Sequence, residues 1–184
     1  VMAAAAGNLT PLTLELGGKS PVILGRSANL GDAVEKIIFN KVVNAGQMCV
    51  SPDYVLVPRD QLEAFISACK TSYGSTYKDS PAEAGGIIND RHYRRLQSYL
   101  AEAREHSTRI ECLAEHSGES SRTMALHLAV SPPADSELGR REVFGPILNV
   151  IPYKNIDDAI SLINAGEKPL ALYYFGSDRK EQRR

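Results

Sequence analysis

The chain has no tryptophan, only three cysteines and almost no excess of charge of either sign. Its 21 Lys and Arg residues nearly balance its 22 Asp and Glu residues, which argues against nucleic acid as a partner and against a protein held at a membrane surface by basic clusters. No apolar run approaches the ~20 residues that a membrane-spanning helix needs. With 184 residues, 43% of them hydrophobic, the sequence favours one globular domain with a single core.

The cysteines and histidines carry little signal by number or spacing. Cys49, Cys69 and Cys112 are scattered and odd in number, which fits a reducing compartment better than a disulfide framework, so we expect a cytoplasmic protein. The four histidines show no spacing typical of metal ligands, so we predict no metal site and expect all four in surface or loop roles. Cys69 lies on an apolar helical face and Cys112 ends a predicted strand, so both are interpreted as buried, inert thiols.

Short apolar segments alternate with amphipathic helical patterns along the whole chain. Strands are predicted at 12–16, 21–24, 54–57, 110–113, 124–130, 147–153 and 170–175. Helices are predicted at about 32–45, 60–73, 89–105 and 155–165, the first two with capping-box starts at Asp32 and Asp60 and the last with Asn155 as its cap. This alternation predicts an α/β fold with a largely parallel open sheet flanked by helices, in three α/β/α layers.

Cys49 is the cysteine that fits a buried role least. Gly46 lets the chain turn after the preceding helix, and Pro52 forbids the helix from continuing. Cys49 is therefore expected at a tight helix–strand junction, where a thiol can be exposed and rigidly held. A thiolate attacks carbonyl carbons well near neutral pH. The alternative is a buried thiol without chemistry.

Two carboxylates stand next to glycine-containing turns. Glu15 precedes Gly17 and ends a predicted strand, so it could be a general base on water at a strand end or simply a solvated side chain. Glu142 begins the run Glu142-Val143-Phe144-Gly145-Pro146. A carboxylate can accept both hydroxyls of a ribose, and an aromatic ring can pack beside a flat ring. The alternative is an ordinary turn before a strand.

Taken together, three segments resemble the NAD(P)-dependent aldehyde dehydrogenase superfamily. They are Leu14-Glu15-Leu16-Gly17-Gly18-Lys19-Ser20-Pro21, Asn44-Ala45-Gly46-Gln47-Met48-Cys49 and Glu142-Val143-Phe144-Gly145-Pro146. Their order and spacing agree with the family pattern. The amino-acid sequences of residues 49–57 and 168–175 resemble those of the class 3 and coniferyl aldehyde dehydrogenase branch.

The resemblance implies roles for named residues. Cys49 would attack an aldehyde to give a thiohemiacetal, and loss of hydride to the nicotinamide would leave a thioester. Glu15 would activate the water that hydrolyses this thioester to the carboxylic acid. Glu142 would hold the nicotinamide ribose with Phe144 packed nearby, while Leu16 and Gly17 would lie near the nicotinamide. The backbone amide of Cys49 would donate to the oxyanion.

The resemblance also implies a domain organisation. Residues 1–184 correspond to the thiol-bearing catalytic domain, truncated at both ends, with the cofactor-binding domain absent. The full-length enzyme is expected to use NAD or NADP, to oxidise an aromatic or medium-chain aldehyde such as coniferyl aldehyde, and to form a homo-oligomer. The chain alone is expected to bind no cofactor and to be inactive. Two alternatives remain open: a cofactor-independent thiol esterase or acyl hydrolase, and a silent piece that mainly self-associates.

Overall fold

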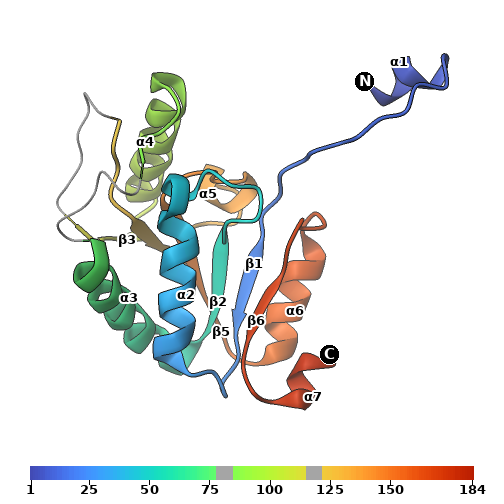
Figure 1. Cartoon of the computed structure of the whole chain (residues 1–184). Helices are drawn as coiled ribbons and strands as arrows, with labels where there is room; N and C mark the ends of the chain where they lie inside the picture. The colour runs from blue at the N-terminus through green and yellow to red at the C-terminus, as the bar shows by residue number, and fades with distance from the viewer. Residues whose placement is uncertain (78–84, 115–121) are drawn as a thin grey trace.

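The computed structural model describes residues 1–77, 85–114 and 122–184. Six strands form one sheet in the order β3-β4-β5-β2-β1-β6 (Figure 1). They are β1 (Pro21–Leu24), β2 (Tyr54–Pro58), β3 (Arg109–Cys112), β4 (His127–Val130), β5 (Ile147–Tyr153) and β6 (Tyr173–Phe175). Every neighbouring pair is parallel except β3 and β4, which are antiparallel. The predicted α/β class with a largely parallel sheet is therefore confirmed.

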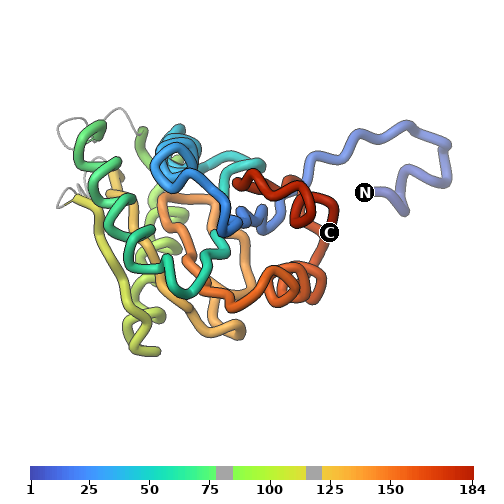
Figure 2. The backbone as a smooth tube through the Cα atoms, turned by 90° about the horizontal axis from the view of Figure 1, so that it is seen from below, coloured from blue at the N-terminus to red at the C-terminus, as the bar shows by residue number. Residues whose placement is uncertain are grey.

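Helices cover both faces of this sheet, as the predicted three-layer arrangement requires. The longer ones are α2 (Leu30–Val42), α3 (Leu62–Tyr77), α4 (Asp90–Glu105) and α6 (Ile156–Ala165). The shorter ones are α1 (Met2–Ala6), α5 (Glu137–Arg140), α7 (Arg179–Gln182) and the 3₁₀ segments η1 (Val43–Gly46) and η2 (Arg59–Gln61). The view from below the sheet separates α2 and α3 on one side from α6 on the other (Figure 2).

Successive side chains of a strand point to opposite faces of the sheet, and this explains which residues pack under which helices. Val22, Val55 and Leu148 point to the face covered by α2 and α3, where the largest buried cluster lies. Ile23 and Leu56, one residue on in each strand, join the cluster under α6. The remaining part of that second face, around Ala129 and Ile147, is covered by α4 and α5. Burial on both faces accounts for the nearly continuous apolar runs in the central strands.

The segment 12–16 is not a strand, contrary to the sequence prediction. Residues 11–17 are exposed, and the chain from α1 to β1 runs away from the body of the domain (Figure 1). An alternating pattern forms a strand only where a neighbour completes its hydrogen bonds, and β1 first meets β2 and β6 at Pro21 and Val22. Pairing thus begins after the turn at Gly17 and Gly18.

Two predicted helix starts were also wrong in detail. Asn29, not Asp32, caps α2 by accepting a hydrogen bond from the Asp32 amide at 3.2 Å. Asp60 lies in η2 and pairs with Arg26 at 2.8 Å instead of capping α3. By contrast, the predicted cap at Asn155 is confirmed, since Asn155 and Asp158 form a reciprocal capping box at the start of α6.

The thiols and histidines depart from expectation at two positions. Cys69 is buried as predicted, but Cys112 is exposed because it ends β3, an edge strand with a neighbour on one side only. His127 is buried on β4, where its Nδ1 lies 2.8 Å from the Ala125 carbonyl oxygen, so it has no surface role. His116 lies outside the described residues. Among the helices that are described, none is long and apolar enough to cross a membrane.

Candidate active site

The three motif-bearing segments meet at one edge of the sheet. Glu15 precedes β1, Cys49 precedes β2 and Glu142 precedes β5. These strands are parallel neighbours, with Tyr54 paired to Pro21 on one side and to Asn149 on the other. The candidate site therefore lies at the amino ends of the strands. Of the two interpretations of Glu15, the one that placed it at the carboxyl end of a strand was wrong, because 12–16 forms no strand.

Cys49 is exposed in the loop between η1 and β2. Three successive residues before it, Asn44, Ala45 and Gly46, have positive φ angles of 52°, 53° and 68°. Left-handed backbone at a residue other than glycine costs ~1–3 kcal/mol and persists only where its surroundings fix it. The Gln47 side chain fixes this turn, because its amide donates to the Asn44 carbonyl at 2.9 Å and accepts from the Ile88 amide at 2.9 Å.

The turn before Cys49 is backed directly against the segment that contains Glu142. A Cβ added to Gly46 would lie 2.6 Å from the Gly145 carbonyl oxygen, so only glycine allows the two backbones to approach this closely. The structure thereby brings together the second and third motifs of the sequence analysis, which are nearly 100 positions apart in the chain.

Glu142 is half-buried against the glycine pair of the first motif. A Cβ added to Gly17 would lie 2.8 Å from Cδ of Glu142. Burial raises the pKa of the Glu142 carboxyl, and a hydrogen bond from the Gly18 amide partly offsets this rise. Gly17 and Glu142, both expected near a cofactor, are thus in contact.

Glu15 and Leu16 are not brought to the other motifs in this way. Glu15 is exposed, and within the described ranges it makes no hydrogen bond or ion pair. Leu16 is 66% exposed. Phe144 is also exposed, at 38%, and has a positive φ of 44°, so its ring and the Glu142 carboxylate are the parts of the third motif that solvent or a ligand can reach.

Sequence reasoning missed a buried charged group beneath these motifs. Asp53 is 2% exposed and forms an ion pair with the Lys19 ammonium. Its Oδ1 also accepts a hydrogen bond from the Val143 amide at 2.7 Å. Lys19 further donates to the carbonyls of Leu138 and Arg141, at 3.0 and 2.9 Å. An Asp directly before an apolar strand was the available signal, since a buried carboxylate needs charged or polar partners.

Lys41 is the second buried charge that the sequence did not reveal. It lies on α2, and burial lowers its pKa to about 8. Lys19 adds to this lowering, whereas Asp53 and Glu142 oppose it. The four charged side chains therefore form one interacting group under the loops that carry Cys49 and Glu142.

Tyr173, at the start of β6, holds the loop beyond Cys49. Its hydroxyl donates to the Val50 carbonyl at 2.8 Å. Burial and the nearby Cys49 raise the pKa of this tyrosine. Tyr173 therefore lies close to the candidate nucleophile, and it fixes the backbone one residue after it.

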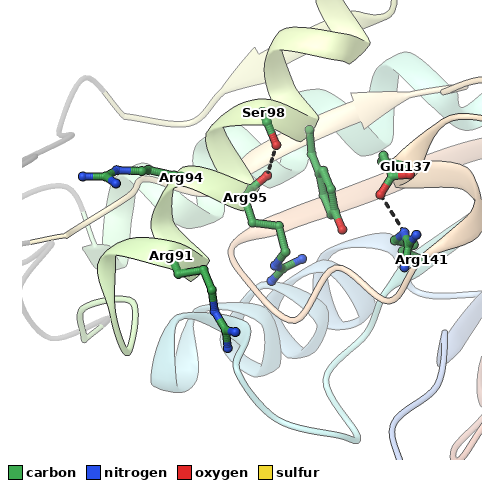
Figure 3. A pocket seen from close by; sticks show the side chains of 7 residues that line it. Arg91, Arg94, Arg95, Ser98, Glu137 and Arg141 are labelled. Atoms are coloured by element: carbon green, nitrogen blue, oxygen red, sulfur yellow. Dashed lines mark hydrogen bonds and ion pairs between the residues drawn. The ribbon is translucent and has the colours of Figure 1, made fainter.

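An open, arginine-rich pocket of about 570 Å³ lies between α4 and α5, beside the same segment (Figure 3). It is lined by Arg91, Arg94, Arg95, Ser98, Tyr99, Glu137 and Arg141. Two of its cations are already engaged. Arg141 pairs with Glu137 at 2.7 Å, and Arg95 donates to the Val143 carbonyl at 2.8 Å while lying over the Tyr99 ring. The pocket wall is thus tied to the third motif.

The donor set fits part of a nicotinamide cofactor and gives no sign of a metal. The half-buried Glu142 carboxylate can accept ribose hydroxyls, and the exposed Phe144 ring offers a flat apolar surface beside it. Within the described part of the chain, no three His, Cys, Asp or Glu side chains are grouped as metal ligands.

Comparison with known proteins agrees with this geometry. The family model described as the aldehyde dehydrogenase family matches residues 1–184. Probable coniferyl aldehyde dehydrogenases from Pseudomonas aeruginosa and Caulobacter vibrioides are 46% and 41% identical to the chain, and each match covers 100% of it. The chain belongs to the aldehyde dehydrogenase family.

The chain spans 39% of the length of these two relatives. A solved structure described as a substrate-bound state of Staphylococcus aureus AldH superposes with a TM-score of 0.91 at 38% identity. That match covers 99% of this chain and 40% of the other. A Mycobacterium tuberculosis aldehyde dehydrogenase complexed with NAD+ superposes with a TM-score of 0.86 at 28% identity, covering 99% of this chain and 40% of that one.

Proposed function

We propose that the protein containing this chain oxidises an aldehyde to the carboxylic acid with NAD or NADP as hydride acceptor. The observation that carries the proposal is the placement of an exposed thiol, Cys49, and a half-buried carboxylate, Glu142, just before the amino ends of two adjacent parallel strands. The close backbone approach of Gly46 to Gly145 supports a fixed distance between the two.

In this mechanism Cys49 is the nucleophile. Its thiolate forms a C–S bond to the aldehyde carbon, and the carbonyl oxygen becomes the oxyanion of a thiohemiacetal, with the Cys49 amide as one donor. The nicotinamide, when bound, supplies the acceptor for the hydride. The acyl group then remains on Cys49 as a thioester.

Glu15 is the proposed general base for hydrolysis. It takes a proton from water, the hydroxide adds to the thioester carbon, and the C–S bond breaks to release the acid and the thiolate. This role requires the segment before β1 to lie against the Cys49 loop. The exposure of Glu15 and its freedom from other partners among the described residues leave it available for that contact.

Glu142 and Phe144 would hold the cofactor. Glu142 would accept hydrogen bonds from the nicotinamide ribose, with Phe144 against the ring and with Leu16 and Gly17 bordering the nicotinamide. Glu142 already accepts from the Gly18 amide, so the carboxylate is oriented before a ribose arrives. Orientation in advance reduces the entropy lost on binding.

We propose an aromatic or medium-chain aldehyde as substrate, with coniferyl aldehyde the first to test. The support is the naming of relatives at 40–46% identity as coniferyl or probable coniferyl aldehyde dehydrogenases. The complete protein is further proposed to be a homo-oligomer in the cytoplasm, where a reducing environment keeps Cys49 available as a thiol.

The 184-residue chain alone is proposed to be inactive, because it covers only 39% of the length of relatives that are named as probable coniferyl aldehyde dehydrogenases. The test compares this chain with the complete protein that carries it, each with coniferyl aldehyde and NAD or NADP. We expect NADH or NADPH formation from the complete protein, none from its Cys49→Ala variant and none from the chain alone. Cofactor reduction by the chain alone would refute its inactivity, and none by the complete protein would refute the dehydrogenase.

Glu15→Gln in the complete protein tests the hydrolytic step separately. Acylation of Cys49 should proceed, so we expect one equivalent of reduced cofactor to form rapidly and steady turnover to fall at least about 100-fold. Mass spectrometry should then find the acyl group on Cys49. Unchanged steady turnover would exclude Glu15 as the base.

One observation favours a second function for the chain alone. Cys49 is exposed, so an activated ester could acylate it, and water could then hydrolyse the resulting thioester without cofactor. Turnover of a nitrophenyl ester that is lost in Cys49→Ala but kept in Cys112→Ala would support this esterase activity.

A further inference from the structure

The main chain of Val143 is held from two sides by charged residues that lie outside the three motifs, Asp53 and Arg95. On the buried side, its N–H donates to Asp53 Oδ1 at 2.7 Å. On the side of the arginine-rich pocket, its carbonyl accepts from Arg95 Nη2 at 2.8 Å. The same residue lies between Glu142 and Phe144, the two side chains proposed to hold the cofactor.

Both contacts are of the stronger kind. Hydrogen bonds to a charged partner are roughly twice as strong as those between neutral groups, and Asp53 is 2% exposed. Asp53 is itself held by the Lys19 ammonium, which also donates to the carbonyls of Leu138 and Arg141 just before Glu142. Arg95 is steadied by the Tyr99 ring, 5.1 Å from its guanidinium carbon. Neither charged group is free to leave Val143 without losing other partners.

The backbone next to Val143 needs such support. Phe144 has a positive φ of 44°, a conformation that costs a non-glycine residue ~1–3 kcal/mol and is kept only when the surroundings impose it. Arg95 also reaches the Phe144 carbonyl, at 3.4 Å. The strained residue is therefore enclosed by the contacts that fix its neighbour.

We propose that Asp53 and Arg95 are positioning residues for cofactor binding: by holding both polar groups of Val143, they set where Glu142 and Phe144 point. Neither side chain needs to touch the cofactor for this role. The inference rests on the proposed function, since it assigns a purpose to the placement of Glu142. A displacement of about 1 Å at such a site can cost about 100-fold in rate or affinity.

Asp53 also joins the two halves of the site. Its backbone N–H donates to the Ser20 carbonyl at 2.9 Å, and its carbonyl accepts from the Asn149 amide at 3.3 Å. Since Asp53 ends the loop that contains Cys49, one residue couples this loop to Ser20, directly before β1, and to Asn149 on β5. Asp53 therefore links the Cys49 loop to the strand that follows Glu142, and through Val143 to Glu142 itself.

The first experiment measures the position of Glu142 in the 184-residue chain itself. The Gly18 amide donates to the Glu142 carboxylate and has no other acceptor among the described residues, so its NMR shift should follow the ionisation of Glu142 with pH. Glu142→Gln should abolish this titration, which would assign the titration to Glu142. We expect Asp53→Asn and Arg95→Met to reduce the amplitude at Gly18 at least twofold, with Arg94→Met unchanged.

The second experiment uses the complete protein. Arg95→Met and Asp53→Asn should raise the KM for the nicotinamide cofactor about tenfold or more, while the KM for the aldehyde changes less than twofold. Arg95→Lys, which keeps a cationic donor, should recover part of the loss. Alkylation of the buried Cys69 reports on the fold, and it should stay slow in every variant.

Arg94→Met is the matched control. Arg94 lies on the same helix and lines the same pocket, but its side chain points away from that of Arg95 (Figure 3), and Arg95 is the one that donates to Val143. If Arg94→Met raised the cofactor KM as much as Arg95→Met, the pocket would act by general attraction for phosphate, and the positioning role would be overturned. A cofactor KM within twofold of wild type in both Asp53→Asn and Arg95→Met would overturn it as well.

The two experiments fail in different ways. If the complete wild-type protein reduces neither NAD nor NADP, the proposed function is wrong, yet the Gly18 titration still decides whether Asp53 and Arg95 place Glu142. If the protein is an active dehydrogenase and the Gly18 titration is intact in both variants, the inference is wrong and the function stands.

Discussion

The Glu142 carboxyl fills the space that a side chain on Gly17 would need: a Cβ on residue 17 would lie 2.8 Å from Cδ of Glu142, closer than atoms can approach. The contact joins the segment before β1 to the segment before β5. The carboxylate end of a flexible side chain can move, so the expected cost of filling this space is a displaced Glu142 and not an unfolded domain.

Gly17→Ala tests this contact directly. Since residue 17 is exposed, we expect the melting temperature to change little, while the cofactor KM of the complete protein rises at least about tenfold. Gly74→Ala is the control, because a Cβ at that helical position meets nothing within 4 Å. An unchanged cofactor KM in Gly17→Ala would show that Glu142 does not bind cofactor from this position.

The three thiols should differ in reactivity. Cys49 and Cys112 are exposed, whereas Cys69 is buried, and burial raises the pKa of the Cys69 thiol well above its usual value. Because the thiolate is the reactive species, we expect iodoacetamide at pH 8 to modify Cys49 and Cys112 while Cys69 stays at least about 100-fold slower. Peptide mass spectrometry gives each rate; fast labelling of Cys69 in the native chain would contradict the fold.

Gly46→Ala should disturb the nucleophile turn. The residue has a φ of 68°, and its added Cβ would lie 2.6 Å from the Gly145 carbonyl oxygen. We expect a loss of about 2–4 kcal/mol in the free energy of unfolding, measured by urea denaturation. Gly85→Ala separates the causes, since Gly85 has a φ of 77° with its nearest neighbouring atom at 4.0 Å. Its expected cost is about 1 kcal/mol; equal costs at both positions would discount the contact with Gly145.

The buried Lys41 predicts a pH dependence of stability. Its pKa is lowered from 10.5 in the unfolded chain to about 8 in the folded one. Between these values the unfolded state binds more protons, so the free energy of unfolding rises with pH through this window; below it both states hold the Lys41 proton and the contribution of Lys41 stays at its lowest value. The shift corresponds to about 3 kcal/mol at most.

Lys41→Met should remove this dependence. We expect the free energy of unfolding of the variant to rise less than that of wild type between pH 8 and 9.5, with the exposed Lys36→Met following wild type. The comparison stops there because burial raises the pKa of Tyr54 and Tyr153 to about 12, and their ionisation in the unfolded chain lowers stability at higher pH. Parallel curves for Lys41→Met and wild type would show that Lys41 is not buried as a charge.

Sequence patterns predicted most of the elements and the outline of the site. Apolar runs in β1, β2 and β5, together with the cap at Asn155, carry their information locally, and these predictions were confirmed. The segment 12–16 failed because alternation does not reveal whether a neighbouring strand is present. The predicted burial of Cys112 was wrong for a related reason, since its exposure follows from the edge position of β3, which depends on strand order.

The sequence revealed the motifs, but not the charged residues that hold the motifs in place. Asp53 and Arg95 both bind Val143, which lies 90 and 48 positions away from them in the chain. Lys41 is set apart by its burial. A single sequence records no such pairing. The roles of Cys49, Glu15, Glu142, Phe144, Leu16 and Gly17 stay predictions until the experiments above are done.

Placement at the amino ends of the strands has a consequence for how this sequence can change in length. Four residues separate Cys49 from Tyr54, four separate Glu142 from Ile147, and five separate Glu15 from Pro21. Each residue of extended chain spans ~3.3 Å, and β1, β2 and β5 are held in register. One residue inserted in any of these short connections would therefore shift one of these three side chains against the other two, whereas a residue added after Gly166, beyond α6, would leave all three connections as they are.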